Sequence, residues 1–382
     1  MRTLAAFLAV LSISGCATII ADNSEVGDVF IAVPEKVFII GQDLDALRGY
    51  YASDCCIRAD GTTAYLSLYR LRDPSDFGGI GYDLDGETVT PEASWGSGPV
   101  GARQSVNEFG VDHLAIGLFI AENDNPGGLT EIAQGKFDPE ITRLADLIKS
   151  VPGQVFLRIG YEFDGTWNLG QDNHQNYIAA YQHIVDQLRS EDVSNALYVW
   201  HGSASIADDL IEGRHEDITD WYPGTNYVDW MGVSWFSVPT EAPSVEGAYD
   251  TKLPLELANE ILDFARTEGK PILIAEAAPQ GFDLTEGFRA NVTPIYDGPS
   301  RENIRKLSPE EIWSIWYTPL FDWMNSNADT VRGLAYINVN WDAQPMWGPP
   351  YNGGFWGDTR LENAPEIAER FNRAVEDWKT GE

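Results

Sequence analysis

Two glutamates each end an apolar segment that has the pattern of a buried strand. Val155-Phe-Leu-Arg-Ile-Gly-Tyr leads into Glu162, and Lys270-Pro-Ile-Leu-Ile-Ala leads into Glu276. A buried carboxylate costs free energy unless it has a partner or a chemical role. One such glutamate could simply cap a loop or pair with an arginine. Two of them, each at the carboxyl end of a strand, favour a shared catalytic site.

A pair of carboxyl groups can cleave a glycosidic bond. In the retaining mechanism an acid protonates the leaving oxygen and a carboxylate attacks the anomeric carbon, with the two groups about 5–5.5 Å apart. The acid must hold its proton near neutral pH, so burial and the second carboxylate must raise its pKa. Strand parity places Arg158 on the same inward face as Glu162, deeper in the fold.

The chain that carries these glutamates alternates between short apolar runs and amphipathic segments, which predicts a parallel α/β fold. Eight runs have the pattern of strands: Val37–Gln42, Ala64–Tyr69, His113–Ala121, Val155–Glu162, Leu197–His201, Val228–Phe236, Pro271–Glu276 and Gly333–Trp341. Eight strands predict one (β/α)8 TIM barrel. The clearest helices are Pro139–Ser150, Gln175–Arg189, Leu255–Thr267, Pro309–Asn325 and Pro365–Lys379. Three long loops, Asp83–Gly98, Pro279–Lys306 and Trp347–Thr359, are expected near the site.

The amino terminus has the pattern of an export signal. Met1-Arg2 is positive, Leu4–Ile13 is a short apolar run, and Ile13-Ser14-Gly15-Cys16 resembles a bacterial lipobox. We expect a signal peptide at 1–16 with lipidation of Cys16, a tether at 17–36 and a catalytic domain at 37–382. The alternatives are an ordinary signal peptide or a short membrane helix, although the run is too short to span a bilayer. The expected location is the outer membrane, on its periplasmic or cell-surface face.

The net charge of −34 argues against nucleic acid as a partner and limits membrane contact to the lipid anchor. Cys55 and Cys56 could form a vicinal disulfide or stay as two buried thiols. They follow the first strand, so we expect them on the site's side of the barrel, where a disulfide could contact sugar. The spacing of His and Cys suggests no metal site, and no cofactor is expected. A monomer is the default expectation.

The whole chain after the tether resembles the clan-A glycoside hydrolases, and most of all family 26, which contains β-mannanases and β-1,3-xylanases. The family's Arg-x-x-His-Glu-x-Asn/Asp-Gly-x-Trp pattern is similar to Arg158-Ile-Gly-Tyr161-Glu162-Phe-Asp164-Gly165-Thr-Trp167. Lys270-Pro271 leading to Glu276 resembles the strand of the family nucleophile. The resemblance implies that Glu162 is the acid/base and Glu276 the nucleophile.

Two residues depart from the family pattern inside the expected site. Tyr161 stands where the family usually has His, and Phe236 stands where the clan usually has a Tyr that hydrogen-bonds the nucleophile. Loss of that hydroxyl would orient Glu276 less well unless another donor replaces it. The chain is therefore expected to be a divergent member, whose sugar cannot be copied from the family.

Other side chains are candidates for binding substrate. The full set is Arg158, Tyr161, Asp164, Trp167, His201, Trp235, Phe236, Asn338, Asn340 and Trp341. Trp341 could be a platform beneath the sugar or a core residue, and Trp167 and Trp235 have the same two interpretations. His201 could bind a hydroxyl or be structural. Asp43 is a weaker candidate for sugar contact, and Asp229 is expected to fix a turn.

These residues predict a retaining, endo-acting glycoside hydrolase that cleaves a β-linked polysaccharide such as β-mannan, β-xylan or a related plant or algal glycan. One alternative is an inactive glycan-binding lipoprotein on the same fold. The other is an exo-acting or transglycosylating enzyme, in which a loop such as Pro279–Lys306 closes one end of the cleft.

Overall fold

The structure is a computed structural model that describes residues 35–71, 93–94, 98–165, 167–204, 217–241, 252–290, 304–344 and 357–381. These residues belong to one compact unit, Pro34–Glu382. Cys16 and nearly all of the expected tether lie outside the described residues, as do parts of the three long loops. No helix among the residues described is long and apolar enough to cross a membrane.

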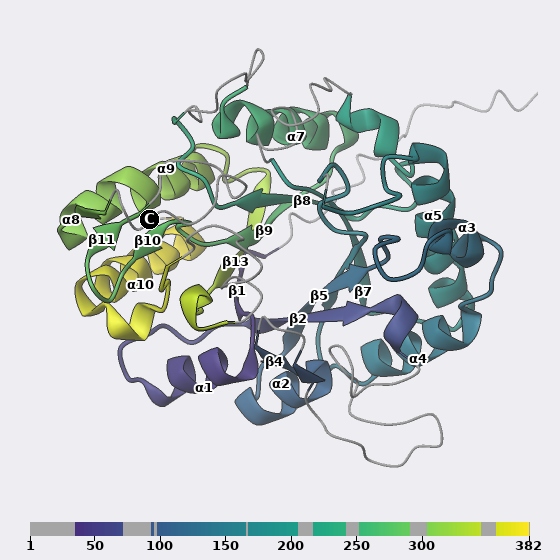
Figure 1. Cartoon of the computed structure of the whole chain (residues 1–382), viewed down its shortest axis with the longest axis horizontal. Coiled ribbons are helices and arrows are strands. Elements are labelled where there is room, and N and C mark those ends of the chain that lie inside the picture. The colour runs from purple at the N-terminus through teal and green to yellow at the C-terminus, as the bar shows by residue number, and fades with distance from the viewer. Residues whose placement is uncertain are drawn as a thin grey trace, which may run out of the picture. The chain divides into compact units, whose positions relative to one another are not determined.

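Eight parallel strands close into a barrel at the centre of the molecule (Figure 1). In chain order they are β1 (Val37–Gly41), β2 (Gly61–Ser67), β5 (His113–Phe119), β6 (Val155–Ile159), β7 (Ala196–Gly202), β8 (Trp230–Trp235), β9 (Ile272–Ala277) and β13 (Val331–Ile337). β13 closes the ring against β1, with Val37 opposite Gly333 and Gly41 opposite Ile337. The predicted TIM barrel is confirmed, and all eight predicted strands are present with bounds shifted by a few residues.

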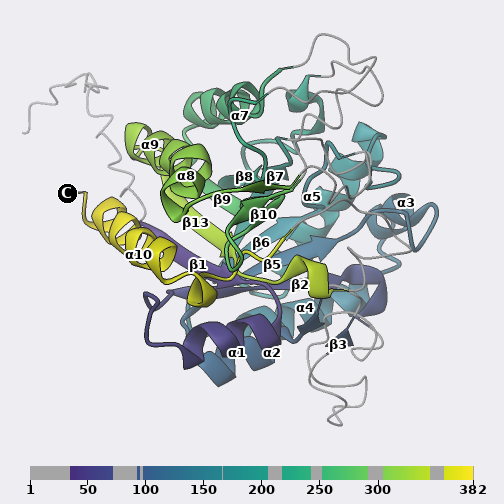
Figure 2. The same cartoon turned by 60° about the vertical axis from the view of Figure 1, so that its left-hand side comes forward.

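Helices surround the barrel (Figures 1 and 2). They are α1 (Leu44–Ala52), α2 (Ala102–Phe109), α3 (Gly128–Ala133), α4 (Asp138–Lys149), α5 (His174–Ser190), α7 (Pro254–Glu268), α8 (Pro309–Ile312), α9 (Thr318–Ser326) and α10 (Pro365–Thr380). The predicted helix Pro309–Asn325 is α8 and α9 joined by a π-helical stretch, Trp313–Tyr317. The sequence analysis missed α1, which begins where Asp43 accepts a hydrogen bond from Ala46 N at 2.9 Å. That cap uses the Asp43 carboxylate for structure.

Smaller elements decorate the barrel. β3 (Ala93–Ser94) pairs with β4 (Pro99–Val100), and β10 (Phe282–Asp283), β11 (Phe288–Arg289) and β12 (Arg305–Lys306) form a three-stranded antiparallel sheet within the expected Pro279–Lys306 loop. Short 3₁₀ turns occur at η1 (Leu68–Arg70), η2 (Ile218–Trp221), η6 (Trp341–Ala343) and η8 (Leu361–Asn363). The loop that follows β9 is therefore partly ordered into a sheet of its own.

The core has two layers because strand side chains alternate between the barrel interior and the surrounding helices. In β8, Trp230 belongs to the interior cluster, whereas Met231 and Val233 belong to the larger cluster beneath the helices. The same alternation turns Ser234 inward and Trp235 outward. In β6, Phe156 lies in the interior cluster and Leu157 in the outer one. Arg158 is therefore inward, as strand parity predicts.

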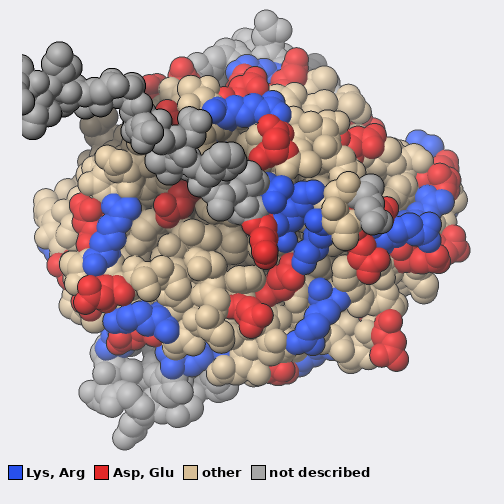
Figure 3. Space-filling view, turned by 180° about the vertical axis from the view of Figure 1, so that it is seen from behind, with Lys and Arg blue, Asp and Glu red and all other residues tan. Residues whose placement is uncertain are grey.

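The surface carries charges of both signs. On the face in Figure 3 acidic side chains are interspersed with basic ones and do not form a continuous patch. Surface ion pairs such as Arg48 with Glu108 and Lys136 with Glu131 follow the same pattern. The large negative charge of the chain is thus not gathered into a single binding surface on that face.

The structure corrects the expected position of Cys55 and Cys56. They lie in the loop between α1 and β2, which leads to the amino end of β2, away from the carboxyl ends of the strands. Both are free thiols, with their Sγ atoms 2.7 Å apart. Asn372 of α10 holds this loop, donating to Cys55 O at 2.6 Å. The pair cannot contact sugar at the carboxyl ends of the strands.

Candidate active site

Glu162 lies in a tight turn that begins where β6 ends. Gly160 and Glu162 have φ of 56° and 52°, in the left-handed region that costs a side-chain-bearing residue about 1 kcal/mol. A Cβ at position 160 would lie 2.7 Å from the Tyr177 ring, so glycine is required there. Asn168 Nδ2 donates to Glu162 O at 2.8 Å, and Gly165 N donates to the same oxygen at 2.9 Å. These bonds hold the strained turn and so aim the carboxyl group.

The Glu162 carboxyl group is half-buried and has a donor on each oxygen. Ser234 Oγ lies 2.7 Å from Oε1, and Trp167 Nε1 donates to Oε2 at 3.1 Å. Burial and the nearby Glu276 charge raise the pKa of Glu162 to about 8, although the bond from Ser234 acts in the opposite direction. Near neutral pH this side chain therefore holds a proton that it can donate.

Glu276 enters the barrel because β9 carries a bulge. On β8, Val233 pairs with Ile274 and the next residue, Ser234, pairs with Glu276, so β9 has one extra residue in this step. β13 shows the same irregularity beside β9. A bulge re-aims the side chains that follow it. Ala275 already faces the interior cluster, so regular alternation would turn Glu276 outward. The bulge turns Glu276 inward instead.

Arg158 supplies the counter-charge for Glu276. Its guanidinium is fully buried, and Nη1 donates to Glu276 Oε1 at 2.5 Å. The guanidinium also lies 5.1 Å from the ring centre of Tyr65 and 5.4 Å from that of Tyr161. The aromatic rings and the carboxylate together stabilise the buried cation. Arg158 therefore acts on Glu276 and is enclosed beneath the site.

The two carboxyl groups meet beside Ser234. Its Oγ bonds Glu162, and its backbone is the register partner of Glu276. The Glu276 charge also contributes to the raised pKa of Glu162. The environments of the two groups differ: Glu162 keeps its proton between two uncharged donors, whereas Glu276 is paired with a guanidinium. This asymmetry is what acid–base chemistry on a glycosidic bond requires.

Comparison with known proteins agrees with this geometry. The model of glycosyl hydrolase family 26 matches residues 123–284, a range that includes both glutamates. Over that range the chain is similar to this family. A β-1,3-xylanase of an Alcaligenes species is 27% identical over 382 residues, which covers 99% of this chain and 71% of the relative. A β-1,3-xylanase of a Vibrio species is also 27% identical, covering 99% of this chain and 72% of that protein.

A solved structure supports the same fold. The GH26 β-mannanase of Bacteroides ovatus superposes with a TM-score of 0.51 at 15% identity, covering 89% of this chain and 88% of that one. The family and the xylanase relatives make the chain a glycosidase that hydrolyses glycans.

Of the other predicted residues, Trp167 and Tyr161 lie beside the two glutamates. Trp167 bonds Glu162, and the half-buried Tyr161 ring lies near Arg158 and 6.5 Å from the His201 ring. Asp164 accepts hydrogen bonds from Ser203 N at 2.7 Å and from Ser203 Oγ at 3.0 Å. Asp164 thus ties the Glu162 turn to the end of β7, which is a positioning role.

The structure moves Trp235 out of the site. It faces away from the barrel interior, is 4% exposed, and packs on Trp323 of α9 with ring centres 5.3 Å apart. Phe236, the next residue, is half-buried with its ring edge toward Trp341 at 6.2 Å. Of the two interpretations of Trp235, the core residue fits, because strand alternation turns it toward the helices, whereas Phe236 stays near the strand ends.

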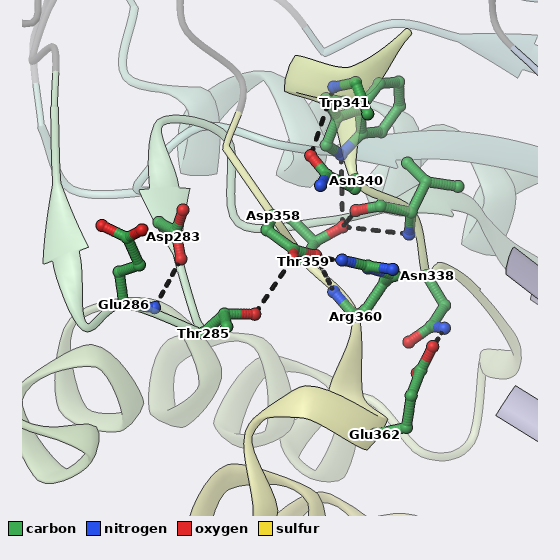
Figure 4. A network of polar contacts seen from close by, with 12 residues as sticks. Asp283, Thr285, Glu286, Asn338, Asn340, Trp341, Asp358, Thr359, Arg360 and Glu362 are labelled. Atoms are coloured by element: carbon green, nitrogen blue, oxygen red, sulfur yellow. Dashed lines mark hydrogen bonds and ion pairs between the residues drawn. The ribbon is translucent and has the colours of Figure 1, made fainter. Parts of the chain in front are cut away.

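The segment after β13 is structural among the described residues (Figure 4). Asn338 is 1% exposed, donates to Glu362 Oε2 at 2.8 Å and accepts from Leu361 N at 2.7 Å, so both ends of its buried amide are engaged in the fold. Asn340 accepts from Ala343 N at 3.3 Å and caps the 3₁₀ turn. Trp341, 2% exposed, donates to Thr359 Oγ1 at 3.2 Å. The core alternative for Trp341 therefore fits better than the platform.

Asp229 and Asp43 have the structural contacts of turn and cap residues. Asp229 Oδ2 accepts from Tyr198 N at 2.9 Å, as expected of a residue that fixes a turn. The second oxygen of Asp43 accepts from Gln344 Nε2 at 3.1 Å, and burial raises its pKa to about 6. With both oxygens engaged, Asp43 is not placed to bind sugar.

Sequence reasoning missed two residues of the site. Ser234 lies between the two glutamates, and Tyr65 of β2 lies on Arg158. Both lie in strands that the sequence predicts. Counting alternate residues along those strands places both side chains inward, so this count could have identified them. They were missed because an inward serine or tyrosine is also common in an ordinary barrel core.

Proposed function

We propose that the chain is a retaining, endo-acting hydrolase of a β-linked polysaccharide, with Glu162 as acid/base and Glu276 as nucleophile. The observation that carries the proposal is the asymmetry of the pair. The pKa of Glu162 is raised to about 8, and Glu276 lies against the Arg158 guanidinium. One group therefore holds a proton near neutral pH, and the other is ion-paired with a guanidinium, as double displacement needs.

The proposed reaction has two steps. First, a Glu276 oxygen bonds to the anomeric carbon while the bond from that carbon to the glycosidic oxygen breaks, and Glu162 transfers its proton to the leaving oxygen. Second, Glu162, now a carboxylate, takes a proton from water as the water oxygen attacks the same carbon and releases Glu276. The two inversions give net retention and restore both carboxyl groups.

β-1,3-Xylan is the first substrate to test. Two proteins named β-1,3-xylanases align with 99% of this chain. The fold neighbour from Bacteroides ovatus is named a β-mannanase, so β-1,4-mannan is the matched comparison. Tyr161 and Phe236 depart from the family pattern. Tyr161 lies beside Arg158 and Phe236 lies beside Trp341, so both are candidates for shaping the sugar subsite.

The test is hydrolysis of β-1,3-xylan, β-1,4-xylan, β-1,4-mannan, β-glucan and algal galactan, followed by proton NMR of the first product formed. We expect cleavage of β-1,3-xylan into oligosaccharides of mixed length whose new reducing ends are initially β-anomers. Release of single sugars from one chain end would replace endo action with the exo alternative. New ends that begin as α-anomers would refute the retaining mechanism.

We further propose that the enzyme is exported as a lipoprotein, because the lipobox pattern ends at Cys16. Expressed in a Gram-negative host, the mature protein should begin at Cys16, carry acyl chains and fractionate with membranes. A Cys16→Ala variant should lose the acyl chains, and a Cys55→Ala variant is the matched control because that thiol lies within the barrel domain. Mass spectrometry of the mature amino terminus decides. An unmodified Cys16 in the wild type would overturn this proposal without touching the catalytic one.

A further inference from the structure

Ser234 connects three strands at the site. It is 4% exposed on the inward face of β8 and is the register partner of Glu276 on β9. Its Oγ lies 2.7 Å from Glu162 Oε1 and 3.0 Å from Nε2 of His201 on β7. A serine hydroxyl has one proton to donate, so Ser234 cannot donate to both, and the geometry has it donating to Glu162.

His201 fixes the direction. It is fully buried, and its Nδ1 has no hydrogen-bond partner among the residues described. A buried N–H without an acceptor is more costly than a bare ring nitrogen, so the proton of the neutral ring belongs on Nε2. Burial and the Arg158 charge hold the pKa of His201 well below its usual value, so the ring stays neutral. His201 Nε2 therefore donates to Ser234, and Ser234 donates to Glu162.

We propose that Ser234, oriented by His201, is a positioning residue that sets the proton affinity of the acid/base Glu162. The proposal rests on the function proposed above, in which Glu162 gives up its proton in one step and regains it in the next. A hydroxyl donor stabilises the charged carboxylate more than the neutral acid. Ser234 thereby limits how strongly Glu162 retains its proton and assists its release to the leaving oxygen.

Other charged groups act on Glu162 from the surrounding strands. Glu276 on β9 and Asp164 in the same turn favour the protonated form, whereas Arg158 on β6 favours the charged form. His201 on β7 is neutral and acts only through Ser234. Trp167 donates to the other oxygen of Glu162. The hydroxyl of Ser234 can be removed without changing the charge of the site.

The test is the pH profile of kcat/KM for Ser234→Ala on the oligosaccharide that the wild type cleaves. Loss of the hydroxyl should move the alkaline limb, near pH 8 in the wild type, upward by about one pH unit. Ser234→Thr keeps a hydroxyl and should restore the wild-type limb. If Ser234→Ala does not fold, as judged by circular dichroism, Ser234→Cys replaces it and should give a smaller upward shift because a thiol donates weakly.

The outcomes separate this proposal from the function on which it rests. Loss of kcat/KM by the same factor at every pH would show that Ser234 is only structural, and would overturn the proposal. An alkaline limb that stays in place in both Ala and Cys variants would overturn it as well. A wild-type limb that persists unchanged in Glu162→Gln would instead refute Glu162 as the acid/base.

Discussion

Replacing Glu276 with alanine should lower kcat/KM by on the order of 10⁴-fold or more, the scale seen when a covalent nucleophile is removed. No other carboxylate among the described residues is paired with Arg158 and aimed at the same interior. Binding of the polysaccharide should remain measurable because Glu162 and Trp167 are untouched. Initial rates and affinity electrophoresis on the same glycan give the two quantities. Turnover at even a tenth of the wild-type rate would remove Glu276 from its proposed role.

The same substitution should also destabilise the fold. Arg158 is fully buried, and Glu276 is the carboxylate of its ion pair. Breaking a buried pair by removing one partner costs roughly 3–5 kcal/mol of unfolding free energy. Glu276→Gln is the matched control, because its amide oxygen still accepts from Arg158 while its nucleophilicity is lost. Urea unfolding should show the loss for Ala and a much smaller one for Gln, although both are inactive. Equal stability of all three proteins would contradict this account of the ion pair.

The barrel could be predicted from the sequence because its signals are local. Short apolar runs such as Val155–Ile159 alternate with amphipathic helices such as Asp138–Lys149, and eight repeats of that pattern fit few folds. Glu162 and Glu276 stood out because a carboxylate at the end of an apolar strand is costly. Their residue types and positions carried the prediction without any knowledge of long-range contacts.

The orientation of side chains at the site could not be predicted in the same way. Strand parity placed Glu162 inward as part of a strand, yet β6 ends at Ile159 and a left-handed turn aims the carboxyl group. For Glu276, parity in β9 would give the outward face, and a bulge reverses it. Every residue of β9 is buried, so its sequence shows no alternation from which a bulge could be recognised.

Long-range partners explain the remaining errors. Asn338 is engaged by Glu362 and Leu361, residues more than twenty positions later in the chain, and nothing near it in sequence signals those contacts. Cys55 was placed on the wrong side because α1 was missed, and that helix carries the chain back to the amino ends of the strands. An undetected helix therefore reverses the predicted side for every residue in the loop that follows it.

Replacing Glu162 with glutamine should lower kcat/KM on polysaccharide by about 10²–10⁴-fold, the usual contribution of a general acid. An aryl glycoside with a good leaving group needs no proton donor in the first step, so that step should proceed. Water attack in the second step would lack its base, and a glycosyl-enzyme should accumulate and give a burst of released aryl group. Stopped-flow absorbance measures the burst. A variant that is equally slow on both substrates would argue against an acid/base role for position 162.

Glu162→Gln should also change the pH dependence of stability, with a sign set by the raised pKa. The ordinary pKa of 4.5 rises to about 8 in the folded protein, so the folded state keeps a proton that the unfolded chain loses above pH 4.5. Stability from this group is fully present below pH 4.5 and falls as pH rises to about 8. At pH 8.5 the glutamine variant should therefore be more stable than wild type by roughly 2–4 kcal/mol, and by far less at pH 4.5. Glu366→Gln, at an exposed position on α10, is the matched control and should match wild type at both pH values. If no pH-dependent gain in unfolding free energy is specific to position 162, the fold does not hold this carboxyl group in its protonated form. The assignment of Glu162 as acid/base and Glu276 as nucleophile would then lose its physical basis.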